Sequence, residues 1–246
     1  LDDPAWEEMS FYGATGLVTH VGGGSYSYLG VDFATGGLDP DFIAISPNGD
    51  GTNDSATFIL SFLRNVKELN LNVVDKNGKV IKEILTEEYV RKNYYDGGRG
   101  EYFYLFSDWA WDGTGKNGKR ASEGQYYMQV EATLDFESAK SQSFTFPVKL
   151  DITSPKLKTK LEKDNKTITV DVSDKTSGVA YWYVEIDGKP VEEATYVNGE
   201  TSHVLTEPIT EDQTVTVVAV DNAGNESTNT VKAGSKGNNG NTGNKN

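Results

Sequence analysis

Short runs in which every second residue is apolar recur along the chain. They include residues 56–63, 69–74 and 126–132, and they are rich in aromatic and β-branched side chains. Alternation with a period of two predicts β-strands that place one face in a core. No window keeps a helical period beyond about three turns, the nearest being residues 86–94, so helix is expected to be a minor component.

Turn-forming pairs separate these runs. Asn-Gly pairs stand at Asn77-Gly78 and Asn117-Gly118, and similar pairs follow later in the chain at Asp187-Gly188 and Asn198-Gly199. Such pairs predict type I′ hairpin turns, which need a positive φ. Strands of about 5 to 9 residues that are joined by turns, without interleaved helices, indicate β-sandwiches rather than a parallel sheet.

Two boundaries divide the 246 residues. The first follows a glycine-rich stretch near residue 40, and the second lies at Asp151-Ile-Thr-Ser-Pro155, where a proline ends one run of strands before another begins. We therefore predict an all-β chain with two sandwich domains in tandem. The expected parts are a connector at 1–39, a sandwich at 40–150, a smaller sandwich at 151–233, and a flexible Gly/Asn linker without apolar residues at 234–246.

The charge and the composition narrow the function. Asp and Glu number 37 against 23 Lys and Arg, a net charge of -14, which repels nucleic acid and anionic membranes. The sequence contains no run of about 18 consecutive apolar residues, so it predicts no membrane-spanning helix. We also expect the chain to be a monomer. The absence of cysteine favours a protein exported by bacteria. Because the chain opens at Leu1 without a signal segment, we interpret it as part of a longer precursor.

Residues for nucleophilic catalysis are scarce. A serine-protease triad needs a histidine between a serine and a carboxylate, and the chain has only His20 and His203. It has no Gly-x-Ser-x-Gly nucleophile elbow, and without cysteine it has no spacing typical of zinc sites. We predict no catalytic residues and no enzyme activity for this chain.

A binding site for a hard cation such as Ca²⁺ is the one candidate ligand site in the sequence. The segment from Ser46 to Asp54 contains four Asn and Asp side chains and two glycines, and oxygen is the ligand that Ca²⁺ prefers. The spacing differs from that of an EF-hand. The alternative is a turn whose Asn and Asp side chains bind their own backbone. The predicted calcium ligands are Asn48, Asp50, Asn53 and Asp54.

Three other aspartates stand beside turn residues. They are Asp112, Asp174 and Asp221, and each could cap its own loop or complete a cation site from a neighbouring strand. Because Asp commonly serves turns, the capping role is favoured for all three.

Several motifs within residues 44–127 occur in an order that resembles a known family. They are Ala44-Ile-Ser-Pro-Asn-Gly-Asp-Gly51, Phe62-Leu-Arg-Asn65, Trp111-Asp-Gly-Thr-Gly-Lys-Asn-Gly118 and Glu123-Gly-Gln-Tyr-Tyr127. Residues 40–150 resemble the second fibronectin-type-III-like domain that follows the protease core in C5a peptidases and lactocepins. Residues 151–233 resemble bacterial Ig-like repeats in the place of a third such domain, and residues 1–39 resemble the exit from a preceding one.

The resemblance implies a function for the whole region. The parent would be a secreted, cell-envelope subtilisin-like serine endopeptidase, and this chain its non-catalytic accessory or spacer region, with the upstream protease domain and protein substrates as partners. The alternative is a surface adhesin or S-layer-associated module that binds host or cell-wall ligands. A carbohydrate-binding module is a third alternative, which would expose Trp109, Trp111 or Trp182 for stacking, although core packing is favoured for these side chains.

Overall fold

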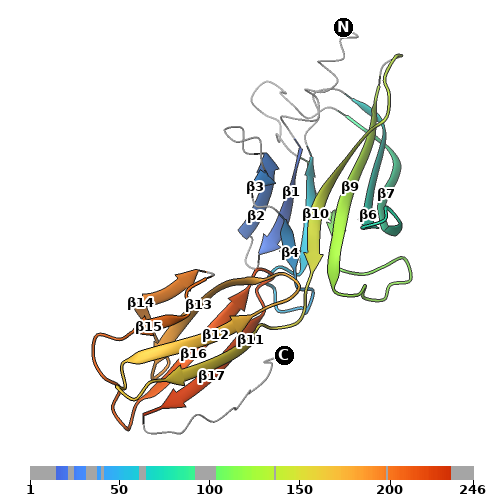
Figure 1. Cartoon of the computed structure of the whole chain (residues 1–246). Helices are drawn as coiled ribbons and strands as arrows, with labels where there is room; N and C mark the ends of the chain where they lie inside the picture. Colours follow the sequence, from blue (N-terminus) through green and yellow to red (C-terminus); the bar gives the residue numbers. More distant parts are fainter. Residues whose placement is uncertain are drawn as a thin grey trace. The chain divides into compact units, whose positions relative to one another are not determined.

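The computed structural model describes a chain built of strands (Figure 1). No helix occurs among the described residues, and so none there is long and apolar enough to cross a membrane. The predicted all-β class is confirmed. The chain divides into two compact units, Leu1–Asp151 and Ile152–Asn246, called unit 1 and unit 2. The residues described are 15–21, 25–31, 38–39, 42–60, 65–91, 104–135, 137–197 and 199–233.

Unit 1 holds ten strands among its described residues. They are β1 (Thr15–Val21), β2 (Ser25–Val31), β3 (Leu38–Asp39), β4 (Ile43–Ile45), β5 (Ser55–Leu60), β6 (Val66–Asp75), β7 (Val80–Val90), β8 (Tyr104–Trp111), β9 (Gly124–Leu134) and β10 (Gln142–Leu150). One sheet has the order β3-β2-β1-β5-β8 and the other β4-β10-β9-β6-β7. Strands β4 and β10 pair in parallel, whereas the remaining neighbours are antiparallel.

The segment predicted as a connector contributes strands to the first sheet. Strand β1 pairs with β2, where Leu17 lies opposite Leu29, and with β5, where Leu17 lies opposite Phe58. Residues 15–39 therefore extend the sheet that residues of the predicted first sandwich begin. The predicted linker at 234–246 lies outside the described residues.

The core of unit 1 takes side chains from both of its sheets. Phe58 and Trp111 from the first sheet are fully buried together with Leu71 and Val130 from the second. In β9, buried residues alternate with less buried ones from Tyr126 to Leu134, as the predicted period requires. Two sheets that share one core in this way form a β-sandwich.

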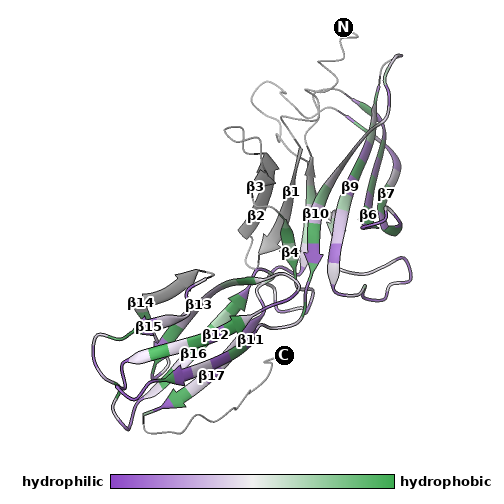
Figure 2. Ribbon diagram, in the orientation of Figure 1, coloured by the Kyte–Doolittle hydropathy of each residue, from purple (hydrophilic) through white to green (hydrophobic). Residues whose placement is uncertain are grey.

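Unit 2 is a smaller sandwich of seven strands among its described residues. They are β11 (Lys156–Leu161), β12 (Thr167–Ser173), β13 (Val179–Ile186), β14 (Lys189–Val197), β15 (Ser202–Val204), β16 (Thr214–Asp221) and β17 (Glu226–Lys232). The sheets have the orders β11-β12-β15 and β14-β13-β16-β17. Hydrophobic and hydrophilic residues alternate along its strands (Figure 2). Ile168 and Val170 of one sheet pack in a core with Trp182 and Val217 of the other.

The glycine turns differ in geometry from one hairpin to the next. Between β13 and β14, Asp187 and Gly188 have φ angles of 51° and 75°, as the predicted type I′ turn requires. At the turn between β6 and β7 only Gly78 is in the left-handed region, and the N–H of Gly78 donates to the carbonyl of Asp75. The type I′ prediction is wrong there, because the loop is longer than two residues. Asn198 lies outside the described residues.

Candidate metal-binding loops

The loop between β4 and β5 carries the predicted calcium ligands. Its ends are joined by a bond from the Ser46 N–H to the Asn53 carbonyl, at 2.8 Å. The two oxygens of Asp54 accept the N–H groups of Gly49 and Gly51, at 2.7 and 2.9 Å. The carboxylate of Asp54 therefore holds the two glycines of the loop next to the residue that ends it.

Asp50 belongs to the same network. Its carboxylate accepts the Thr52 N–H at 2.7 Å and the side-chain amide of Asn48 at 2.8 Å, while the Asn48 side-chain oxygen accepts the Asp50 N–H at 2.9 Å. The structure thus brings three of the four predicted ligands, Asn48, Asp50 and Asp54, into one hydrogen-bonded loop. The fourth, Asn53, takes part through its carbonyl and has a left-handed φ of 51°. These are the bonds of an Asx-rich turn, and calcium at this loop stays a prediction.

The loop packs against a second phrase of the resemblance, Trp111-Asp-Gly113. A Cβ atom added at Gly113 would lie 2.7 Å from the Pro47 ring and 2.9 Å from Leu150. Arg120 donates a hydrogen bond to the Pro47 carbonyl. Two motifs that are more than 60 residues apart in the sequence therefore pack against each other in unit 1. This contact gives a physical reason for both motifs to be present in one domain.

Two loops of unit 2 are organised by carboxylates, one buried and one half-buried. Asp221, which is 2% exposed at the end of β16, accepts the N–H groups of Ala223 and Asn225 at 2.8 and 2.9 Å, and the Asn225 side-chain amide at 2.9 Å. Asp174, which follows β12, accepts the N–H groups of Thr176 and Gly178 at 3.0 and 2.8 Å. The capping role predicted for these two aspartates agrees with these bonds.

Asn222 ties these two loops of unit 2 to each other. Its side-chain amide donates to the carbonyls of Ser177 and Gly178 at 2.9 and 3.0 Å, and its N–H donates to the Gly178 carbonyl at 3.0 Å. The loops at 174–178 and 221–225 are therefore fixed side by side, with their carboxylates close together.

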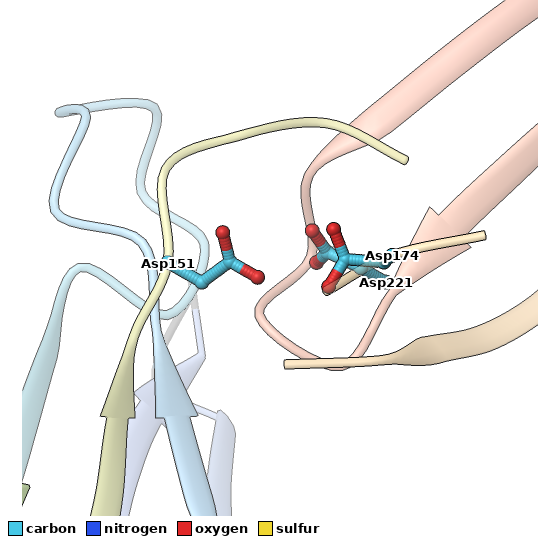
Figure 3. A group of neighbouring side chains, drawn as sticks. All are labelled: Asp151, Asp174 and Asp221. Carbon is cyan, nitrogen blue, oxygen red and sulfur yellow. The ribbon is translucent and has the colours of Figure 1, made fainter. Parts of the chain in front are cut away.

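The carboxylates of Asp174 and Asp221 are neighbours in unit 2 (Figure 3). One oxygen of each lies within 4.8 Å of the other. Sequence reasoning considered Asp174 and Asp221 separately. Their proximity depends on which loops adjoin in space, and residue spacing along the chain does not contain that information.

His203 and three of the tryptophans are buried. His203 is 7% exposed in β15, and His20 lies in β1, where its backbone pairs with Tyr26 and Ser55. Trp109, Trp111 and Trp182 are at most 5% exposed, so none of them forms an exposed stacking platform. The indole N–H of Trp182 donates to the Glu200 carbonyl at 2.9 Å, which satisfies it within the core.

Comparison with known proteins supplies relatives by sequence. The chain is 33% identical over 202 residues to C5a peptidase of Streptococcus pyogenes, a match that covers 75% of the chain and 17% of that protein. C5a peptidase of a serotype M6 strain is 35% identical over 155 residues, 59% of the chain and 13% of the relative. No protein-family model matches the chain.

Among solved structures, the fibronectin(III)-like modules of CbhA from Clostridium thermocellum match with a TM-score of 0.42 and 14% identity, over 78% of the chain and 88% of the modules. The chain spans about a sixth of the length of the curated relatives it matches, 17% for the first. The predicted resemblance is therefore confirmed in sequence: the chain is homologous to an accessory part of streptococcal C5a peptidases.

Proposed function

We propose that this chain is a non-catalytic accessory region of a secreted, cell-envelope subtilisin-like serine endopeptidase, and that it positions the protease core and contributes to substrate binding. The observation that carries the proposal is the 33% identity to a 17% portion of C5a peptidase. Two sandwiches with separate cores suit a spacer, because each core is stable against its own sheets. The same proposal holds that the region contacts protein substrates and that the parent protein is attached to the bacterial surface.

Two measurements test this role. The purified chain should not hydrolyse casein, because a chain with only two histidines and no Gly-x-Ser-x-Gly elbow is not expected to assemble an activated serine. In the parent protein, removal of this region should slow cleavage of a folded protein substrate and leave cleavage of a short peptide unchanged. Casein hydrolysis by the purified chain that a serine-directed inhibitor blocks would contradict the first expectation, and equal slowing of both substrates the second.

The adhesin alternative makes a different prediction for the gene. An adhesin would encode further Ig-like repeats upstream of Leu1, whereas the proposed protease would encode a subtilisin-like domain there. The coding sequence upstream of this segment therefore separates the two functions.

We propose further that calcium is bound by the loop that contains Asn48, Asp50, Asn53 and Asp54. Support comes from its density of oxygen ligands and from the lone pairs that remain on carboxylate oxygens after each accepts one N–H. Calcium at a hundred times its dissociation constant would stabilise the folded form by about 2.7 kcal/mol. The melting temperature should then rise in calcium relative to chelator.

Substitutions locate the ion. Asp50→Ala should abolish the calcium-dependent shift. Asp75→Ala is the matched control, because the Asp75 carboxylate, like that of Asp50, accepts two hydrogen bonds in an exposed turn of unit 1, in this case from the N–H groups of Asn77 and Lys79. A shift that survives Asp50→Ala but disappears in Asp221→Ala would place the ion at the loops of Asp174 and Asp221 in unit 2 instead. Identical melting curves in calcium and in chelator would refute calcium binding.

A further inference from the structure

The outward face of the sheet β14-β13-β16-β17 carries an aromatic patch. On β13, Trp182 and Val184 point into the core, so the alternating residues Tyr181, Tyr183 and Glu185 point outward. On β16, the inward positions are Val215, Val217 and Ala219, which leaves Val218 and Val220 on the outward face.

These outward side chains form one surface. Tyr181 lies opposite Val220 and Tyr183 opposite Val218 in the strand register. The tyrosine rings stack with centroids 6.4 Å apart and an interplanar angle of 29°. Val218 and Val220 are only 4% and 5% exposed although they lie outside the core cluster, whereas Tyr181 is 39% exposed. We call these four residues the tyrosine patch.

Two carboxylates border the tyrosine patch. Glu226 lies opposite Val220 on β17, and Glu185 follows Tyr183 on the same face of β13. Burial raises the pKa of Tyr183, and the negative charges of Glu226 and Glu185 raise this pKa further, which places both carboxylates near the ring. Within the described part of unit 2, neither glutamate takes part in a salt bridge.

No lysine or arginine occupies an outward position of β13 or β16, and on β17 the outward lysine, Lys232, lies opposite Thr214, at the other end of the strand from Glu226. A ligand at the tyrosine patch therefore meets aromatic faces and negative charge together.

The combination suits a side chain with an apolar stem and a cationic head. Aromatic faces attract ammonium and guanidinium groups, and the methylene stems of lysine and arginine pack on apolar surface. A neutral sugar would stack on the rings but would leave both carboxylates without a counter-charge. We propose that this face binds a basic polypeptide segment, whose lysine or arginine side chains cover Tyr181 and Tyr183 and reach Glu185 and Glu226. This goes beyond the proposed function, because the binding belongs to this chain and needs no protease domain.

Binding is tested with the whole chain and a fluorescein-labelled peptide of alternating lysine and glycine, followed by fluorescence anisotropy. The double substitution Glu185→Gln and Glu226→Gln should weaken binding about ten-fold, and Tyr181→Leu by a similar factor, whereas Tyr181→Phe should retain most of the affinity. The matched control is Glu207→Gln with Glu211→Gln. It removes the same charge from exposed loop positions of unit 2 and should change the affinity less than about two-fold.

Each outcome decides the proposal, provided that the melting temperature shows each variant to be folded. Equal weakening by the control pair would show general attraction to an acidic protein and would overturn the site. Binding of cellohexaose without binding of the lysine peptide would replace it with a sugar site. Absence of binding to either probe would refute the proposal while leaving the accessory role, which is measured on protease cleavage, untouched.

Discussion

Replacement of Gly113 by alanine tests the contact between the two motifs of unit 1. Gly113 has a φ of 77° and follows Trp111, whose indole N–H donates to the Thr114 carbonyl at 2.9 Å. An added Cβ would lie 2.7 Å from the Pro47 ring and 2.9 Å from a Leu150 methyl group, both closer than ordinary van der Waals contact. The proline ring is rigid and Leu150 is fully buried, so neither can move freely.

The expected loss of stability has two parts. A left-handed conformation costs a non-glycine residue about 1–2 kcal/mol. Overpacking of a well-packed site adds about 1–3 kcal/mol. Gly118→Ala separates them, since Gly118 has a φ of 71° but no atom within 4 Å of an added Cβ. Gly113→Ala should therefore lower the free energy of unfolding by about 1–3 kcal/mol more than Gly118→Ala.

Urea denaturation followed by tryptophan fluorescence measures both variants, because Trp109 and Trp111 are buried in unit 1. Hydrogen exchange measured on peptides from β10, a strand of unit 1, shows whether the unfolding transition that shifts belongs to this unit. Equal destabilisation by the two substitutions would show that only the backbone conformation matters at residue 113, and the proposed packing of Pro47 against the Trp-Asp-Gly turn would be refuted.

Two further predictions concern unit 2. Hydrogen bonds from the N–H groups of Thr167 and Lys166 and from the Thr167 hydroxyl lower the pKa of Asp164 from 3.8 to about 2, so the ionised form favours folding. Its contribution should be complete above pH 4 and disappear as the pH falls towards about 2, so the difference in melting temperature between the protein and Asp164→Asn should shrink over that range; a constant difference would contradict the prediction. Asn222→Ala should lower the free energy of unfolding by about 0.5–1.5 kcal/mol and speed hydrogen exchange of the Gly178 N–H, whereas unchanged exchange would show that Asn222 does not fix the loops.

The strands with strong alternation were predictable from sequence. The runs at 69–74 and 126–132 lie within β6 and β9, where one face packs in the core. The start of the window nearest to a helical period, residues 86–90, is part of β7. Its pairing with β6 supplies the hydrogen bonds of this segment, so tertiary context decides its conformation.

Other features were missed for different reasons. Strands β1 and β2 flank Gly22-Gly-Gly24, and two runs rich in Val, Thr and Tyr around glycines are a hairpin signal that the connector prediction did not use. The pair of Asp174 and Asp221 had no such signal. The two residues are 47 positions apart in the sequence, and only the folded loops of unit 2 bring them together.

The acidic composition follows partly from the number of turns. Carboxylates accept backbone N–H groups two to five residues away along the chain at Asp50, Asp54, Asp75, Asp112, Asp164, Asp174 and Asp221. The three salt bridges among the described residues are all at the surface, where such pairs contribute little. Negative charge therefore serves loop closure more than ion pairing.

This use of aspartate constrains any metal site in the same loops. An ion at Asp50 or Asp54 must bind lone pairs that the N–H groups leave available, so turn and ion share the same carboxylates. Asparagine keeps one acceptor oxygen but loses the charge, whereas alanine loses both. Asp50→Asn should therefore abolish calcium stabilisation while retaining most of the stability measured in chelator. Asp50→Ala should abolish calcium stabilisation and also lower the stability measured in chelator. If Asp50→Asn kept the full calcium-dependent rise in melting temperature, the carboxylate charge would have no part in binding.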